Sequence, residues 1–434
     1  MPSMRIRAAV LALVAAAARP APAQLPSASA RALGLGDNFT ALARGHDALA
    51  WNPAGLAMPD GARFSVELLG IRGGLGLGPI GVGELGDFEA RLIPEPTKRA
   101  WLERISAAGA QAGSFGADVT YLSMSVGRIG VQVSTTLAGG LHLTPDAAEL
   151  LLFGNAGRTG EPRDLVLSGS NASVAATSTI ALGYARPLAF RIGAFPEQHL
   201  AVGATLKYTI GHMLAHGWDA GSVIAKDPLG VGIAFPIIQT DAAGLNHGVG
   251  LGIDVGLAWQ GGPYTAGVVL RNAVHSFSWD RSTLTYRPGE LAFGHDTIHA
   301  NFAVGMLSEA PATLRRSAAD FLSAFRFRPA LALGFAARPR PDLLLSADLR
   351  QRLGPSHDWM SAQAATHLGI GAAIEVDPRL RARAGAAVLT GGLQLAGGLG
   401  AAFGRARVDL AGAFRAAGGA HHWIGMLAAS YALP

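Results

Sequence analysis

Residues 249–259 read VGLGIDVGLAW, and their strict alternation decides the class of fold. One parity holds large apolar side chains: Val249, Leu251, Ile253, Val255, Leu257 and Trp259. The other parity holds small or polar residues: Gly250, Gly252, Asp254, Gly256 and Ala258. A period of two residues is typical of a β-strand whose faces meet different environments. An apolar face opposite a small and polar face suits lipid on one side and a lumen on the other.

The same alternation recurs along most of the chain, for example in LRARAGAAV (380–388 of the sequence) and RVDLAGAF (407–414). We predict about fourteen strands. They lie at 61–72, 117–127, 129–140, 173–186, 199–211, 248–259, 264–277, 328–338, 342–352, 366–376, 380–390, 392–403, 406–417 and 421–433. The number is even, and each strand is close to the ~9–11 residues that a tilted strand needs to cross a bilayer.

The connections between these strands alternate in length. One set is short, as at 127–130, 260–264 and 404–406, whereas the other begins with long segments at 73–116, 141–172, 212–247 and 278–327. Short turns at one rim and long loops at the other are typical of outer-membrane barrels. The long loops contain helical patterns. The sequence therefore predicts an all-β transmembrane antiparallel barrel with helical extracellular loops, formed by residues 61–434.

Composition supports this prediction. The chain has 434 residues, a net charge of +5, a charged fraction of 15% and no Cys. The charged fraction is well below the ~25% of soluble domains. Yet the part of the chain after the N-terminal leader contains no run of about 18 apolar residues, which a membrane helix would need. The absence of Cys excludes disulfides and thiol chemistry. No Lys/Arg run is interleaved with aromatic residues, so we expect no nucleic-acid partner, and the basic surface suits anionic lipid of the outer membrane.

The N-terminus predicts export. Arg5 and Arg7 precede an apolar stretch from Ala8 to Ala18, and Ala21-Pro22-Ala23 forms a small-residue cleavage pattern before Gln24. These features are typical of a secretory signal peptide, here residues 1–23. A short membrane anchor is the alternative, but the apolar stretch is too short for one. We expect the protein in the outer membrane of a Gram-negative type of cell.

The stretch DALAWNPAGLAMPD, residues 47–60, predicts a short helix that stops at Asn52-Pro53 and is followed by a loop. Residues 30–57, ARALGLGDNFTALARGHDALAWNPAGLA, resemble the N-terminal region of FadL-type outer-membrane channels and their PorV-like relatives. Gly34, Gly36 and Phe39 match the Gly-rich start of that region, and Asp47-Ala48 and Asn52-Pro53-Ala54 match its second part.

The resemblance implies a fourteen-stranded barrel and a hatch, residues 24–60, folded back inside the lumen. Its predicted residues are Gly34, Gly36, Asp47, Trp51, Asn52, Pro53 and Ala54. We also predict a polar set in the lumen: Arg379, Arg381, Arg383, Arg405, Arg407 and Asp409. These arginines are expected to pair with Asp37 or Asp47 of the hatch, or with Asp409 and Glu375 on neighbouring strands.

Three segments in the long loops have helical patterns with an apolar stripe: TKRAWLERI, LTPDAAELLLFGNAG and PATLRRSAADFLSAF. Such stripes serve as contact surfaces between loop helices and the barrel rim, or as a ligand-binding groove. For the second interpretation the candidate capture residues are Trp101, Leu102, Phe153 and Phe321.

Other chemistry is poorly supported. Gly76 to Gly81 match G-x-G-x-x-G, but Pro79 blocks the helix that a nucleotide site requires. His212 and His216 lack a third ligand nearby and are interpreted as loop histidines. We therefore expect no enzyme activity, metal or cofactor. The leading hypothesis is FadL-like uptake of small hydrophobic compounds, and the alternative is a PorV-like barrel that docks exported proteins.

Overall fold

The computed structural model describes residues 29–59, 61–154, 157–161, 163–189, 197–225, 230–241, 243–293, 298–324, 327–354, 364–417 and 420–433. The predicted signal peptide, residues 1–23, lies outside the described residues. Each statement below concerns only this part of the chain.

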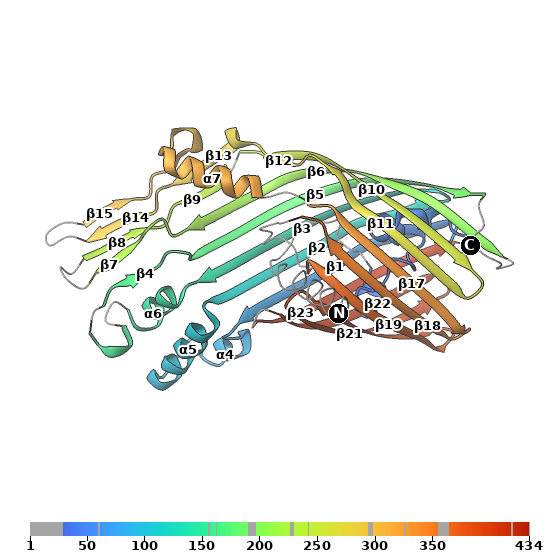
Figure 1. Ribbon diagram of the computed structural model, residues 1–434, viewed down its shortest axis with the longest axis horizontal. Coiled ribbons are helices and arrows are strands. Elements are labelled where there is room, and N and C mark those ends of the chain that lie inside the picture. The colour runs from blue at the N-terminus through green and yellow to red at the C-terminus, as the bar shows by residue number, and fades with distance from the viewer. Residues whose placement is uncertain are drawn as a thin grey trace, which may run out of the picture.

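Fourteen antiparallel strands close into a barrel, in which each strand pairs with the next along the chain and the last pairs with the first (Figure 1). The strands are β1 (Phe64–Gly78), β2 (Gln111–Val126), β3 (Ile129–Leu143), β5 (Asn171–Leu188), β6 (Gln198–Trp218), β10 (Gly248–Gly261), β11 (Tyr264–His275), β17 (Ala330–Arg340), β18 (Leu343–Arg352), β19 (Thr366–Asp377), β20 (Leu380–Leu389), β21 (Gly392–Phe403), β22 (Ala406–Ala417) and β23 (Ala420–Leu433). The predicted fold class is confirmed.

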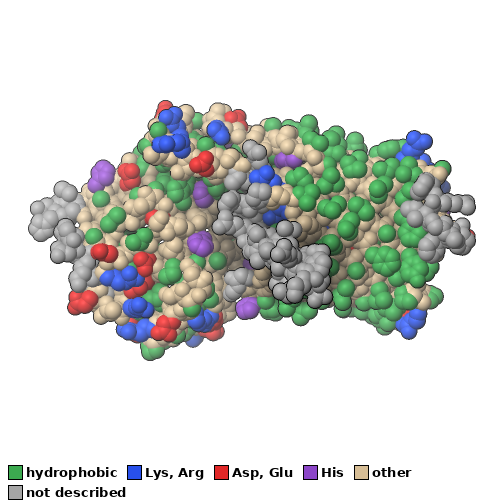
Figure 2. Space-filling view, viewed as in Figure 1, with side chains coloured by type: hydrophobic (Ala, Val, Ile, Leu, Met, Phe, Trp, Pro, Cys, Tyr) green, Lys and Arg blue, Asp and Glu red, His purple; other side chains and the backbone are tan. Residues whose placement is uncertain are grey.

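The two parities of each strand face opposite environments, as the alternation predicts. On β10 the side chains of Leu251, Val255 and Leu257 are exposed on the outer surface, whereas Gly252 and Asp254 are buried inside. Hydrophobic side chains cover the barrel strands as a broad belt, with Lys and Arg at the short-turn rim (Figure 2). An outer surface that is almost free of charge is what a hydrocarbon environment requires.

The barrel wall is uneven in height. β5 and β6 have 18 and 21 residues, whereas β18 and β20 have 10 each. β6 extends because its end pairs with β9 (Ile237–Thr240), which pairs in turn with β13 (Leu284–Arg287) and then β16 (Gly305–Met306). β12 (Ser278–Trp279) adds to β10. His212 and His216, predicted in a loop, therefore lie on β6.

A second, five-stranded antiparallel sheet projects beyond the barrel (Figure 1). Its order is β4 (Leu165–Val166), β7 (Val223–Ala225), β8 (Gly230–Ala234), β14 (Glu290–Phe293) and β15 (Ile298–Asn301). The sequence analysis predicted helices in the long loops but did not predict this sheet. It forms because backbone groups of long loops need hydrogen-bond partners, which strands from three different loops supply to each other.

The long loops also carry the three predicted helices, α5 (Glu95–Ala108), α6 (Pro145–Phe153) and α7 (Ala312–Ala324). The short helix α4 (Val82–Gly86) and the turns η3 (Gly157–Thr159), η4 (Arg281–Thr283) and η5 (Leu307–Glu309) were not predicted. Thr144 caps α6 and Pro145 begins it, as the sequence predicts. Among the described helices, none has both the length and the apolar character needed to span a membrane.

Residues 29–59, which we call the lumenal segment, lie inside the barrel. They form α2 (Ala30–Gly34), η1 (Gly45–Asp47), α3 (Ala48–Trp51) and η2 (Pro53–Ala57). α2 contacts β20 to β23, η1 contacts β1 to β3, and η2 contacts β5, β6 and β10. Contacts on strands all around the barrel place this segment across the lumen, where nearly all its residues are buried.

Candidate functional site

The boundary between the lumenal segment and the barrel wall holds the densest set of buried polar groups in the described structure. The backbone hydrogen bonds of residues 29–59 are local to the segment. Its bonds to the wall, within the described residues, all involve a side chain. The segment is therefore not a further strand of the barrel, because side-chain contacts alone connect it to the wall.

Trp51 is held between two cations of the wall. The guanidinium groups of Arg271 on β11 and Arg350 on β18 lie 5.1 and 5.3 Å from its ring. Phe39 meets the same ring edge-on at 5.7 Å. Trp51 is almost fully buried. Cation–π attraction grows when the groups are removed from water, so this cluster is a strong attachment for the segment.

The Asn52-Pro53-Ala54 motif performs two structural tasks. The Asn52 side chain accepts a hydrogen bond from the Ala54 backbone N–H and so caps η2, and Pro53 begins that turn. The Nδ2 atom of Asn52 donates to the carbonyl oxygen of Thr40 at 3.2 Å and to that of Leu257, on β10, at 3.0 Å. One side-chain amide thus joins two parts of the segment to the wall. These contacts need a donor and an acceptor on one short side chain, and Asn provides both.

The Gly-rich start of the segment ends in a tight turn that the wall surrounds with polar groups. Gly36 and Asp37 both have positive φ, of 69° and 65°. The Asp37 carboxylate faces Arg72 of β1 at 3.5 Å and accepts a hydrogen bond from Gln394 of β21 at 3.4 Å. Next to it, Asn38 accepts a hydrogen bond from His367 of β19 at 2.9 Å.

A wall carboxylate completes this attachment. Asp348 on β18 accepts hydrogen bonds from the backbone N–H groups of Phe39 at 3.1 Å and Thr40 at 2.9 Å. An ionised acceptor makes shorter and stronger hydrogen bonds than a neutral one. Asp348 therefore fixes the backbone of the segment directly after the turn.

Wall glycines make room for the segment. A Cβ placed on Gly203 of β6 would overlap the backbone of Pro53 and Ala54, and one on Gly385 of β20 would overlap Leu35 and Gly36. The lumen is lined by small residues at these points because a backbone lies directly against them. Gly34 of the segment lies equally close, since its Cβ would meet Gly398 at 3.2 Å.

The second half of the segment contains a buried charged cluster. The Arg31 guanidinium pairs with Asp47. His46 Nε2 lies 3.8 Å from Asp47 Oδ1 and 3.9 Å from Glu67 Oε2 on β1. All three of His46, Asp47 and Glu67 are at most 5% exposed. Two neighbouring residues of η1 and one wall strand thus bring a ring nitrogen and two carboxylates together.

The predicted lumenal arginines divide into two groups. Arg383 is buried and pairs with Asp409 at 2.8 Å, and Arg381 pairs with Glu375 at 2.6 Å near the lumen mouth. Arg383 and Arg381 therefore pair with carboxylates of the wall, which is one of the two outcomes that the sequence analysis left open. Asp37 and Asp47 of the lumenal segment pair instead with Arg72 and Arg31.

The remaining members of that predicted set lie at the short-turn rim. Arg379 and Arg405 are exposed in the turns after β19 and β21, and Arg407 is half-buried. Arg379 and Arg405 therefore lie outside the buried polar cluster of the lumen, because the alternation stops where each strand turns.

The four candidate capture residues lie in two separate apolar clusters. Trp101 and Leu102 on α5 are buried against Ile80, Ile105 and Ala148, with Phe153 of α6 at the margin. Phe321 on α7 belongs to a different cluster at the outer end of the barrel. There its ring stacks on His216 of β6 at 3.7 Å. Trp101 and Leu102 therefore hold α5 and α6 together, and only Phe321 lies against a barrel strand.

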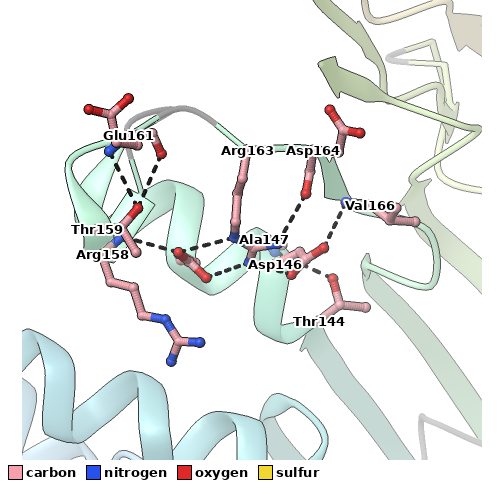
Figure 3. Close-up of polar contacts among 10 residues, drawn as sticks. Thr144, Asp146, Ala147, Arg158, Thr159, Glu161, Arg163, Asp164 and Val166 are labelled. Carbon is pink, nitrogen blue, oxygen red and sulfur yellow. Dashed lines mark hydrogen bonds and ion pairs between the residues drawn. The ribbon is translucent and has the colours of Figure 1, made fainter. Parts of the chain in front are cut away.

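A polar network organises the loop around α6 (Figure 3). Arg163 pairs with Asp146 at 2.8 Å and also with Glu149, and Asp146 accepts from the Val166 backbone N–H of the second sheet. The Arg163 guanidinium hydrogen-bonded to Glu149 holds the pKa of that carboxyl below its ordinary value. Ionic contacts thus connect α6 to the edge of the second sheet.

The sequence analysis missed several wall residues of the site, among them Arg72, Arg271, Asp348, Arg350 and His367. A signal for three of them was present, because Asp348 and Arg350 share the inward parity of one predicted strand and Arg271 lies in another. A charge on the lumenal parity marks a group that needs a partner inside the barrel. Glu67 carries the same signal on the first strand.

Comparison with known proteins agrees with this architecture. A family model described as "F plasmid transfer operon, TraF, protein" matches residues 100–348. No curated protein sequence matches the chain. The solved structure of the P. putida toluene transporter TodX superposes with a TM-score of 0.50 at 13% identity, covering 94% of this chain and 99% of that one.

A Pseudomonas aeruginosa FadL homologue gives a TM-score of 0.50 at 12% identity, covering 96% of this chain and 100% of that one. The chain therefore has the fold of FadL/TodX-type outer-membrane hydrocarbon channels, as the resemblance of its N-terminal region implies.

Proposed function

The chain belongs to the family described as F plasmid transfer operon, TraF, protein, and from its fold we propose that it is an outer-membrane channel for small hydrophobic compounds. The observation that carries this proposal is the nature of the lumenal boundary. Side chains alone attach residues 29–59 to the wall within the described structure. Such a segment can shift without breaking the barrel's own hydrogen-bond ladder, and it thus serves as the hatch.

The outer end of the barrel supplies an apolar region for first contact. The cluster around α7 includes Phe277, Trp279 and Phe327, with Trp218 and Phe321 partly buried against it. A hydrophobic compound gains free energy on leaving water for such a surface, at roughly 25 cal/mol per Å² of apolar area. We assign first contact to Phe321. Trp101, Leu102 and Phe153 contribute only when α5 and α6 separate.

Passage then proceeds inward past the attachment points of the hatch. The polar cluster around Trp51 and Asp37 closes the lumen to water and ions, because charged groups there are paired with the segment. A local movement at one attachment suffices for a small compound. The outer-membrane location belongs to the same proposal and is supported by the apolar belt of the barrel (Figure 2).

Uptake into proteoliposomes tests this function. Wild-type protein is expected to admit a labelled monoaromatic hydrocarbon or a labelled fatty acid faster than empty liposomes. A variant that lacks residues 29–59 is expected to admit polar solutes as well. Phe321→Ala is expected to slow hydrophobic uptake, whereas Leu151→Ala, an exposed apolar residue on α6, serves as the matched control. Uptake equal to that of empty liposomes contradicts the proposal.

A second candidate function is the docking of an exported protein at the outer membrane. The observation that favours it is the five-stranded sheet, whose edge strand β15 is followed by exposed apolar residues Phe302 and Val304. An exposed strand edge with apolar side chains is suited to pairing with another chain. This candidate predicts a protein that copurifies in mild detergent and no solute uptake.

A further inference from the structure

The cluster of His46, Asp47 and Glu67 has the composition of a metal site. One ligand atom from each residue can be chosen so that all three lie within 4.8 Å of one another. His46 Nε2 is the common neighbour, at 3.8 Å from Asp47 Oδ1 and 3.9 Å from Glu67 Oε2. A neutral imidazole and two carboxylates are a donor set that divalent transition metals favour.

Orphaned polar atoms point to a missing ligand at this place. Asp47 Oδ1 and Glu67 Oε1 are buried and have no hydrogen-bond partner among the described residues. Both side chains are more than nine-tenths buried. A buried carboxylate oxygen without a partner is costly, and such groups in native structures call for an explanation. A cation beside His46 Nε2 satisfies Asp47 Oδ1, and it also satisfies Glu67 Oε1 when it contacts both oxygens of that carboxylate.

The charge balance of the cluster gives the same indication. Arg31 pairs with Asp47 through Oδ2, which leaves Oδ1 directed towards His46. Glu67 forms no ion pair with a Lys or Arg among the described residues, and its charged neighbours further away are Arg31 and Asp409. A divalent cation supplies Glu67 with the direct cationic contact that Arg31 gives to Asp47.

The backbone of η1 is held so that both of its ligands face β1. Gly45 has a φ of 58°, and a side chain there would overlap Ser65. The His46 N–H donates to Ser65 Oγ at 2.8 Å, and Ser123 Oγ donates to the His46 carbonyl at 2.9 Å. Two wall strands thus fix the position of His46, and the adjacent Asp47 is fixed with it.

We propose that His46, Asp47 and Glu67 bind one divalent transition-metal ion of the Zn²⁺ class between the lumenal segment and strand β1. Ligand atoms around a tetrahedral ion with bonds of about 2.1 Å lie roughly 3.4 Å apart. The two separations from His46 Nε2 require a contraction of about 0.5 Å to reach this spacing, and all three ligand atoms already lie within 4.8 Å of one another. Because two ligands belong to the segment and one to the wall, the ion clamps the segment to the barrel.

Metal binding by the full chain in detergent tests this proposal without a transport assay. Protein stripped with a chelator is titrated with Zn²⁺ by calorimetry, and with Co²⁺ while its visible absorption is recorded. The wild type is expected to bind one equivalent. His46→Gln and Glu67→Gln are each expected to weaken binding by more than the roughly 10–100-fold that loss of an outer-sphere partner costs. His142→Gln, an exposed histidine on β3, is the matched control.

Circular dichroism and the unfolding temperature without metal establish that each variant is folded. Zn²⁺ is also expected to raise the unfolding temperature of the wild type and of His142→Gln, but not of the two cluster variants. Absence of saturable binding by the wild type overturns the proposal. So does binding that is unchanged in either His46→Gln or Glu67→Gln, because the ion then lies elsewhere on the protein.

Discussion

At the scale of single residues, Trp51 is the side chain on which the attachment of the lumenal segment depends most. Its ring contacts Arg271 and Arg350 of the wall and Phe39 of its own segment. The two arginines come from β11 and β18, which both pair with β17 between them in the barrel. The indole ring therefore offsets part of the electrostatic free energy that is needed to place two cations close together in the lumen.

Trp51→Ala is expected to lower the free energy of unfolding by about 3–5 kcal/mol, the usual cost of truncating a buried Trp. The variant is also expected to leak small polar solutes, because both arginines lose the aromatic ring that they face. Denaturant unfolding in detergent and a solute-leak assay in liposomes measure the two effects. Trp51→Phe keeps an aromatic ring and is expected to retain most of both properties; equal behaviour of the two variants would count against the role assigned here.

Gly385 provides a second residue-scale prediction, since the backbone of Leu35 and Gly36 lies directly against it. Gly385→Ala is expected to displace the segment at a cost of about 1–3 kcal/mol, the range for overpacking. The same substitution at Gly425 of β23, where a Cβ would have no heavy atom within 4 Å, is the control. If the two variants leak and unfold alike, the close contact at Gly385 does not contribute to stability.

At the scale of elements, the barrel strands and the loop elements obey different rules. Eleven of the fourteen strands lie within three residues of their predicted bounds, because a lipid-facing strand must alternate along its whole membrane-spanning length. The other three, β1, β2 and β6, extend six or seven residues further at their long-loop ends. The long loops are under no such constraint. Their strands β7, β8, β14 and β15 are only three to five residues long, and the two hairpins that they form join through β8 and β14, which come from different loops, so no local pattern indicates the sheet.

The loop around α6 is expected to be sensitive to acid. Because Arg163 lowers the pKa of Glu149, the ionised carboxyl stabilises the folded loop. This stabilisation is fully present above the ordinary carboxyl pKa and is lost as the pH falls through the lowered value. A spin label at Leu151 on α6 is expected to become more mobile between neutral pH and about pH 3.

Glu149→Gln is expected to make α6 mobile at neutral pH and to remove most of that pH dependence. Glu161→Gln is the matched control, because the hydrogen bonds of residue 161 are made by its backbone. A spin label that responds to pH equally in the Glu149→Gln variant and the wild type would assign the effect to other groups.

At the scale of the whole molecule, the apolar belt and the filled lumen both follow from the two parities of the barrel strands. The outer parity contacts a medium without hydrogen-bond partners, so the barrel must close and leave no strand edge within the belt. The inner parity is small and polar, and the lumenal segment occupies that space. The second sheet and α7 extend the molecule beyond the belt, where strand edges are tolerated because water is available.

Val255→Arg tests the membrane orientation of the barrel. Val255 lies in the middle of β10 with its side chain on the outer surface. An Arg at the bilayer midplane is expected to cost about 2–4 kcal/mol of folding free energy in lipid. Val166→Arg, on the exposed second sheet, is expected to cost little. Equilibrium folding into bilayers measures both, and equal costs would argue against the proposed position of the belt.

The sequence alone determined the barrel, its strand number and the outward face of each strand. It could do so because the demand of lipid is local and repeats every second residue, as in residues 249–259. These features can be predicted because each strand depends on neighbours in the chain and on a uniform solvent. The segment inside the lumen was implied by the family resemblance that the Asn52-Pro53-Ala54 motif carries, and not by a local pattern.

Only the tertiary structure decided which groups meet. Arg271 and Arg350 converge on Trp51 because the barrel curves three distant parts of the chain around one point. His46, Asp47 and Glu67 meet for the same reason. Ser65 of β1 and Ser123 of β2 hydrogen-bond to the backbone of His46 and so hold η1 beside the wall. The partner of a lumenal charge depends on strand tilt, closure and the path of the segment across the lumen. These are properties of the closed cylinder, and no single strand carries them in its sequence.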